Sequence, residues 1–207
     1  DIYHATSNPR YEGYNTNVAK VTGLTCSRPG YTLQGYALSA EQDTYVEADY
    51  LIAANASVLK TPYTAEAGLT LYAIWSAKEY TITFNGNKPA NAPADSEVEQ
   101  TATTVTVVYD ANTNLKVAYT ASLNGYTFVG YYIDGTIQLF NENGNVLPNV
   151  DGYTKNGTWV GLENVEVIAK WDVNVYTITY DLAGGTASNP ATYTIETATF
   201  KLNNPTK

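Results

Sequence analysis

The sequence has few of the residues on which most reactive sites depend. Its 207 residues include no methionine, one cysteine, Cys26, and one histidine, His4. A single cysteine cannot form an internal disulfide, a redox pair or a zinc site, and one histidine makes a Ser-His-Asp or Cys-His arrangement untenable. We therefore expect Cys26 to be a small apolar residue in or beside a strand. The missing methionine favours a mature secreted segment or a fragment of a longer protein.

Charge and long apolar runs are also scarce. Charged residues make up 15% of the chain, below the roughly 25% usual in soluble domains, and the formal net charge is −9. An acidic chain without a run of Lys or Arg repels phosphate backbones, which argues against nucleic acid as a partner. No apolar run approaches the roughly 18 residues of a membrane span, so membrane insertion is not expected. Hydrophobic residues nevertheless make up 44% of the chain, enough for a packed core.

Three sequence blocks occur twice in the same order. The matching pairs are Gly30–Tyr36 with Gly125–Tyr131, Leu69–Trp75 with Val165–Trp171, and Tyr80–Phe84 with Tyr176–Tyr180. The offsets are 125 − 30 = 95, 171 − 75 = 96 and 176 − 80 = 96, so a single one-residue insertion or deletion reconciles all three pairs.

This spacing predicts tandem domains. A unit of about 96 residues is large enough to fold alone, whereas the units of solenoid proteins, roughly 20 to 50 residues long, are not. The predicted units cover residues 1–79, with a divergent or clipped start, and residues 80–175, which are complete. Residues 176–207 would be the opening strands of a third unit.

Every strong periodic pattern in the chain has a period of two residues. Val165, Val167 and Ala169 alternate with Glu166 and Lys170, which is typical of a half-buried strand. Asn-Gly and Gly-Gly pairs between such segments supply the positive φ of tight turns. Only the stretch from 38 to 51 has the composition of a short helix. The predicted fold class is therefore mainly β, built of tandem small domains with little helix.

The repeated blocks resemble the Listeria-Bacteroides repeat, also called the internalin B-repeat, of surface proteins from Gram-positive and some gut bacteria. That family has a Tyr-Thr-x-Thr-[Phe/Tyr] strand, a Gly-Tyr-Thr-Phe-x-Gly-[Trp/Tyr] block and a closing Leu-Tyr-Ala-x-Trp strand, matched here by Tyr80–Phe84, Gly125–Tyr131 and Val165–Trp171. Tyr36 and Tyr131 stand where the family usually has Trp, and the unit here is longer. The resemblance implies β-grasp-like domains, an extracellular role in adhesion or as a spacer, and no catalytic residues.

Other candidate sites for chemistry fail on inspection of the residues. Two groups of carboxylates, at positions 41–49 and 163–166, lack the flanking aromatic residues of a glycosidase cleft and are interpreted as solvated surface. The segment from Asp110 to Asn114 imitates a calcium loop, but Leu115 and Ala121 replace the required Gly and Glu. We therefore predict no enzyme activity, no metal and no cofactor.

Aromatic residues are the remaining candidates for binding. The chain has 19 tyrosines, more than three small cores can bury, so some rings must reach the surface. Tyr131 and Tyr132 are adjacent in a strand, so one ring points inward and the other outward. Trp159 lies between two glycines in a loop-rich stretch. Tyr132 and Trp159 together form the predicted binding surface, with a polysaccharide or host protein as the partner.

Two functions from different classes follow from these patterns. The first is a non-enzymatic repeat module of a bacterial cell-surface protein, acting as a spacer, stalk or adhesin segment. The alternative is a carbohydrate- or host-protein-binding module that uses exposed aromatic residues. The predicted localisation is extracellular, at the cell surface or secreted. Residues 176–207 would carry unpaired strand edges, which we expect to pair with a neighbouring sheet of the same chain or of another copy.

Overall fold

The computed structural model describes residues 4–5, 26–37, 52–53 and 71–207. Their regular structure is almost entirely β-strand, and the one helical element among them is a single 3₁₀ turn, η2 (Asn114–Lys116). This confirms the mainly β prediction with little helix. The short helix predicted over 38–51 lies outside the described residues. The chain divides into two compact units, Asp1–Glu79 and Tyr80–Lys207.

The first unit contains a four-stranded antiparallel sheet. Its strands are β1 (His4–Ala5), β2 (Tyr31–Ala37), β3 (Ile52–Ala53) and β4 (Leu71–Ala77), in the order β1-β4-β2-β3. The Gly-Tyr-Thr block forms β2 and the Trp-ended block forms β4, and the two strands pair along most of their length. The recurring blocks of the sequence are therefore the strands of the sheet.

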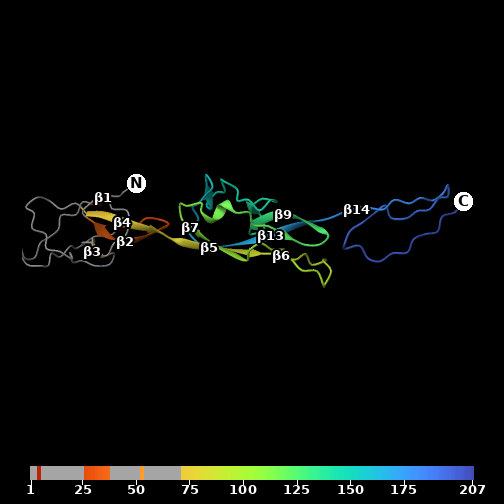
Figure 1. Cartoon of the computed structure of the whole chain (residues 1–207), viewed down its shortest axis with the longest axis horizontal. Helices are drawn as coiled ribbons and strands as arrows, with labels where there is room; N and C mark the ends of the chain where they lie inside the picture. The colour runs from red at the N-terminus through yellow and green to blue at the C-terminus, as the bar shows by residue number, and fades with distance from the viewer. Residues whose placement is uncertain (1–3, 6–25, 38–51, 54–70) are drawn as a thin grey trace, which may run out of the picture. The chain divides into compact units, whose positions relative to one another are not determined.

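The second unit is built on a five-stranded mixed sheet (Figure 1). Its strands, in spatial order, are β10 (Ile137–Phe140), β9 (Tyr126–Ile133), β13 (Val165–Val173), β5 (Glu79–Asn85) and β7 (Thr104–Val108). β13 pairs in parallel with β5 on one side and antiparallel with β9 on the other. The first and last long strands of the unit therefore lie side by side at the centre of the sheet.

Three pairs of very short strands complete the second unit. They are β6 (Glu99–Gln100) with β8 (Ala121–Ser122), β11 (Thr154–Lys155) with β12 (Thr158–Trp159), and β14 (Tyr176–Thr177) with β15 (Thr192–Tyr193). The predicted Asn-Gly turn connects β11 to β12, where Asn156 and Gly157 have φ values of 50° and 78°. Both residues thus have the positive φ that a tight hairpin turn needs.

The core of the second unit is a cluster of aromatic rings on one face of its sheet. The Phe84 ring centroid lies 4.9 Å from those of Tyr119 and Tyr131 and 5.3 Å from that of Phe140. β5 contributes alternate residues to this face, because Tyr80, Ile82 and Phe84 are buried while the residues between them are not. Connecting segments such as 109–122 and 141–160 supply the covering residues in place of a helix.

The paired strands of the two units have the same register. Leu33 pairs with Trp75 and Tyr36 with Ala73, and the equivalent residues, 95 and 96 positions later, pair in the same way. Both ladders also have a register shift at the equivalent place. In the first unit it lies between Leu33 and Gly35 of β2. In the second unit it lies between Lys170 and Trp171 of β13, which pair with Gly130 and Phe128 of β9. The two copies of the repeated sequence thus pair their strands in the same way, with the register shift at the equivalent position.

Two finer expectations stay predictions. A β-grasp fold requires a helix packed on a mixed sheet, and the second unit has the mixed sheet with loops on its face. The independence of the predicted units 1–79, 80–175 and 176–207 also stays a prediction, since residues 176–207 group with the second unit. Within that segment β14 pairs with β15 and Thr186 with Thr206, so its described strands pair with each other.

Candidate functional site

Trp159 is in the core, and the prediction that its ring is exposed is wrong. Its side chain has 0% exposure, and its ring centroid lies 6.0 Å from that of Tyr153. Two backbone hydrogen bonds fix the strand, from Asp110 N–H to the Trp159 carbonyl and from Trp159 N–H to the Ala111 carbonyl. Gly161 provides the space, because a Cβ there would lie 2.5 Å from a ring carbon. Trp159 therefore closes the core and cannot be part of a binding surface.

Tyr132 lies apart from Trp159, on the outer face of the sheet. Its neighbour Tyr131 is fully buried and Tyr132 is half-buried, as their alternation predicts. The ammonium group of Lys170, on the adjacent strand, lies 4.3 Å from the centre of the Tyr132 ring. This cation–π contact covers one face of the ring. The structure does not bring the two residues of the predicted surface together.

The equivalent tryptophans of the two units, Trp75 in β4 and Trp171 in β13, occupy the same register but differ in hydrogen bonding. Trp171 is half-buried, packs against the aromatic core and donates from Nε1 to the Gly86 carbonyl at 2.9 Å. Trp75 is also half-buried, and its buried Nε1 has no hydrogen-bond partner within the described part of the chain. The Trp171 indole therefore has both a packing and a hydrogen-bonding role, whereas the Trp75 Nε1 is unsatisfied among the described residues.

Cys26 has a side-chain contact inside the first unit. It is a half-buried free thiol whose sulfur lies 3.2 Å from the Tyr36 hydroxyl oxygen. Burial, and then the hydrogen bond with Cys26, raise the pKa of the Tyr36 phenol. His4 lies in β1, which pairs with β4. Cys26 therefore lies beside β2 and contacts the Tyr36 side chain of that strand.

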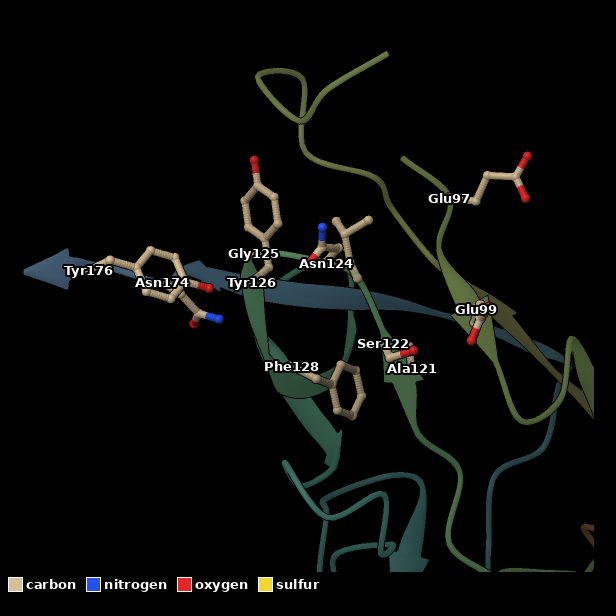
Figure 2. Close-up of a pocket in the computed structure, with 11 residues that line it drawn as sticks. Glu97, Glu99, Ala121, Ser122, Asn124, Gly125, Tyr126, Phe128, Asn174 and Tyr176 are labelled. Carbon is tan, nitrogen blue, oxygen red and sulfur yellow. The ribbon is translucent and has the colours of Figure 1, made fainter. Parts of the chain in front are cut away.

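A groove of about 630 Å³ lies on the second unit, between β6, β8, β9 and the start of β14. Figure 2 shows Glu97 and Glu99 on one side of it and the rings of Tyr126 and Tyr176 on the other, with Phe128 below. The remaining lining residues are Ala121, Ser122, Leu123, Asn124, Gly125 and Asn174. No sequence motif marks this groove, because its walls come from segments up to 79 residues apart.

The polar groups of the groove differ in how they are held. Glu97 and Glu99 are exposed and lie two residues apart, and although the Glu99 backbone pairs with Ser122, neither side-chain carboxylate has a hydrogen bond or ion pair with any described residue. The Tyr126 hydroxyl donates to Glu196 at 2.7 Å. Burial first, and then Glu196 through its hydrogen bond and charge, raise the pKa of Tyr126 to about 12. The Tyr126 phenol is therefore an uncharged part of the groove wall that is held by its hydrogen bond, whereas the two carboxylates remain free to accept hydrogen bonds.

Tyr176 offers the most accessible ring of the groove. It is 41% exposed, and its ring stacks on Tyr193 with centroids 5.3 Å apart and planes inclined by 30°. One face of the ring thus rests on a partner. An aromatic ring opposite two unpaired carboxylates, with amide side chains between them, can hold a polyhydroxylated or cationic ligand by stacking and hydrogen bonds.

Comparison with known proteins gives little information on function. No protein-family model matches the sequence. No solved structure matches it either. The chain is similar to a protein of Evansella cellulosilytica named "Putative Gly-rich membrane protein", with 29% identity over 168 residues. The match covers 77% of this chain and 16% of the relative, so the chain spans about a sixth of the length of the curated relative it matches.

The relative corrects one expectation and leaves others as they were. Its name places it among membrane proteins, which contradicts the predicted extracellular, cell-surface or secreted localisation. That prediction, drawn from the family resemblance, is wrong. Over the described ranges, no helix has the length and apolar character needed to cross a membrane. The resemblance to the Listeria-Bacteroides repeat stays a prediction.

Proposed function

We propose that this chain is a non-enzymatic segment of repeat units that acts as a spacer or adhesin segment within a larger, membrane-associated protein. The observation that carries the proposal is the equal register of β2–β4 and β9–β13, including the shared irregularity. A duplicated sheet with the same pairing is what an array of structural units requires. The match to a short part of a protein named as a membrane protein supports the larger context.

The interior of the second unit agrees with a structural role. Its buried side chains are almost all apolar or aromatic, and the one buried polar residue in the described ranges, Thr154, is fully hydrogen-bonded. The Thr154 hydroxyl donates to the Leu147 carbonyl at 2.7 Å and accepts from Val150 N–H at 2.9 Å. These buried groups therefore serve packing or the satisfaction of backbone atoms, except the buried Nε1 of Trp159, which has no hydrogen-bond partner among the described residues.

The spacer role is tested by changing the number of units. A chain with a second copy of residues 80–175 inserted after Val175 is compared with the natural chain by small-angle X-ray scattering. A compact unit of about 96 residues has a radius of gyration near 13 Å, so the maximum dimension should grow by roughly 30 Å. An unchanged maximum dimension would show that the extra unit folds back on its neighbours, and the spacer role would be rejected.

The groove favours binding of a saccharide as a second candidate function. The observation behind it is the 41% exposed ring of Tyr176 opposite the unpaired Glu97 and Glu99. Sugar rings present an apolar face that stacks on aromatic rings, and hydroxyl groups that donate to carboxylates. The groove thereby replaces the predicted surface of Tyr132 and Trp159 as the location for this function.

Calorimetric titration with cellohexaose, chitohexaose and a mannan oligosaccharide tests the saccharide proposal. We expect saturable binding of one of these probes that is lost in Tyr176→Ser and in the double variant Glu97→Gln/Glu99→Gln. Tyr132→Ser is the matched control, because it removes a half-buried tyrosine outside the groove and should leave the binding unchanged. Absence of binding to all three probes, or equal loss in the control, would reject the groove as a saccharide site.

A further inference from the structure

The first and last long strands of the second unit are direct neighbours, and they run in the same direction. The register of β5 and β13 pairs Ile82 with Val165 and continues to Asn85 with Ile168. The chain enters the unit at the start of β5 and leaves β13 at Val173. Tension along the chain therefore pulls these parallel strands in opposite directions along their length.

This geometry loads all the bonds between the two strands at once. When the ends of a parallel pair are pulled from opposite ends, every inter-strand hydrogen bond is sheared together. When a pair is pulled from one end, the bonds break one at a time. Because one hydrogen bond contributes only a modest net energy, simultaneous loading determines whether the pair resists force. The order of strands in the sheet thus places β5 and β13 in the shear arrangement.

Side-chain hydrogen bonds extend this interface beyond the backbone ladder. At one end, Thr81 N–H donates to Asn164 Oδ1 at 2.8 Å, and Asn85 Nδ2 of the last ladder pair donates to Glu166 Oε1 at 3.0 Å. At the other end, Asn87 Nδ2 donates to the Ala169 carbonyl at 2.9 Å. Each of these bonds crosses between the two chain segments that tension would separate.

The Trp171 indole makes a further cross-link at the same end. Its Nε1 donates to the Gly86 carbonyl at 2.9 Å, and its ring packs against Phe128 with centroids 5.6 Å apart. Asn87, which follows Gly86, has a φ of 44°, so the chain turns away from the direction of β5 directly after the Gly86 carbonyl that Trp171 contacts. The contacts of Trp171 and Asn87 therefore extend the connection past the last ladder pair, Asn85 with Ile168.

We propose that the β5–β13 interface is a mechanical clamp that makes the second unit resist tension applied through the chain. The clamp consists of the parallel ladder together with the side-chain bonds of Asn164, Glu166, Asn87 and Trp171. The inference rests on the proposed spacer function for the origin of the load. The resistance itself is a property of this unit.

Single-molecule pulling tests the clamp through the direction of force. In a Cys26→Ala background, handles are attached through Glu79→Cys and Val175→Cys, which shear β5 against β13. The comparison uses Glu79→Cys and Leu162→Cys, which pull both strands from the same end and unzip them. Positions 79, 162 and 175 are all exposed. We expect a several-fold higher unfolding force in the shear geometry, because bonds loaded together fail together. Equal forces in the two geometries would overturn the proposal.

Substitutions locate the clamp. The double variant Asn87→Gly/Asn164→Ala removes two bonds across the interface while the glycine accepts the positive φ of position 87, and Asn141→Ala is the matched control. Asn141 Oδ1 accepts from the Asn143 and Asn145 backbone N–H groups, both at 3.0 Å, within one turn away from β5 and β13. Under constant shear load, we expect the double variant to unfold more than tenfold faster, at about fivefold for each bond, and the control to unfold less than twofold faster.

Other outcomes distinguish the clamp from general destabilisation and from the spacer function. Equal acceleration by the double variant and the control would show that general destabilisation governs the rate, and the clamp would be rejected. Trp171→Phe keeps an aromatic side chain but removes the indole N–H, and it serves as the test if the double variant fails to fold. We expect it to unfold about fivefold faster than the natural chain. A high shear force in a chain whose extra unit adds no length would retain the clamp and reject the spacer function. A low shear force in a chain whose extra unit does add length would reject the clamp and retain the spacer function.

Discussion

The repeated irregularity in the strand pairing predicts a large and local effect of Gly130→Ala. Gly130 has a φ of 133°, and a Cβ at this position would lie 2.4 Å from the Phe140 carbonyl oxygen of the adjacent strand β10. It would also lie 2.8 Å from Gln138 Nε2. The flexible glutamine can move, but the backbone oxygen moves only if β10 moves. The two strands cannot both keep their places around an alanine.

The cost has two parts. A residue with a side chain at positive φ costs about 1–2 kcal/mol, and overpacking against fixed atoms costs about 1–3 kcal/mol, so Gly130→Ala should destabilise the unit by about 2–5 kcal/mol. Gly135→Ala is the matched control. Gly135 also has a positive φ, of 65°, but nothing lies within 4 Å of the position that a Cβ would occupy there, so its cost should be about 1 kcal/mol.

Hydrogen–deuterium exchange resolved by peptide mass spectrometry measures both variants on the full chain. Gly130→Ala should accelerate exchange in β9, β10 and β13 by at least about fivefold over Gly135→Ala, which corresponds to a difference of about 1 kcal/mol. Exchange in β2 and β4 of the first unit should be unchanged. Equal acceleration by the two substitutions would refute the argument that close approach of β10 requires glycine at position 130.

Four other perturbations have defined outcomes. Trp159→Ala should destabilise the second unit by about 3–5 kcal/mol in urea unfolding, because it empties a fully buried site; a change below about 1 kcal/mol would contradict its burial. Raising the pH from about 10 to about 12 should destabilise the unit through Tyr126, because the folded chain holds this phenolic proton to about 12 and the unfolded chain to about 10. Glu196→Gln should lower the Tyr126 pKa in a carbon-detected NMR titration, and an unchanged pKa would exclude Glu196 as a cause. Lys170→Gln should cost about 0.5–1 kcal/mol through loss of the contact with Tyr132, and no loss in urea unfolding would show that this contact is not stabilising.

Much of the sheet could be predicted because its signals are local. The alternation of Val165, Val167 and Ala169 with charged residues is sufficient to predict β13 and its buried face, and the structure buries Val167 and Ala169 completely. The Asn156-Gly157 pair likewise predicts its hairpin turn. Such patterns depend on neighbours in sequence, so they can be found without knowledge of the fold.

The location of Trp159 and the groove could not be predicted, for a different reason. Flanking glycines indicated a loop at Trp159, whereas Gly161 instead leaves the space that the indole ring fills. Its burial depends on the 109–111 segment, which is far away in sequence. The groove likewise is lined by Glu97 and Tyr176, which come from segments far apart in sequence. Long-range pairing determines both, and no local pattern encodes it.

The central proposal is that the two units are separate structural modules, each stabilised by its own tryptophan, Trp75 in β4 and Trp171 in β13. The most direct test measures hydrogen exchange across the full chain in Trp75→Ala and in Trp171→Ala. We predict that Trp75→Ala accelerates exchange in β2 and β4 only, and that Trp171→Ala accelerates exchange in β5, β9 and β13 only. Loss of protection in both units after either single substitution would contradict the account.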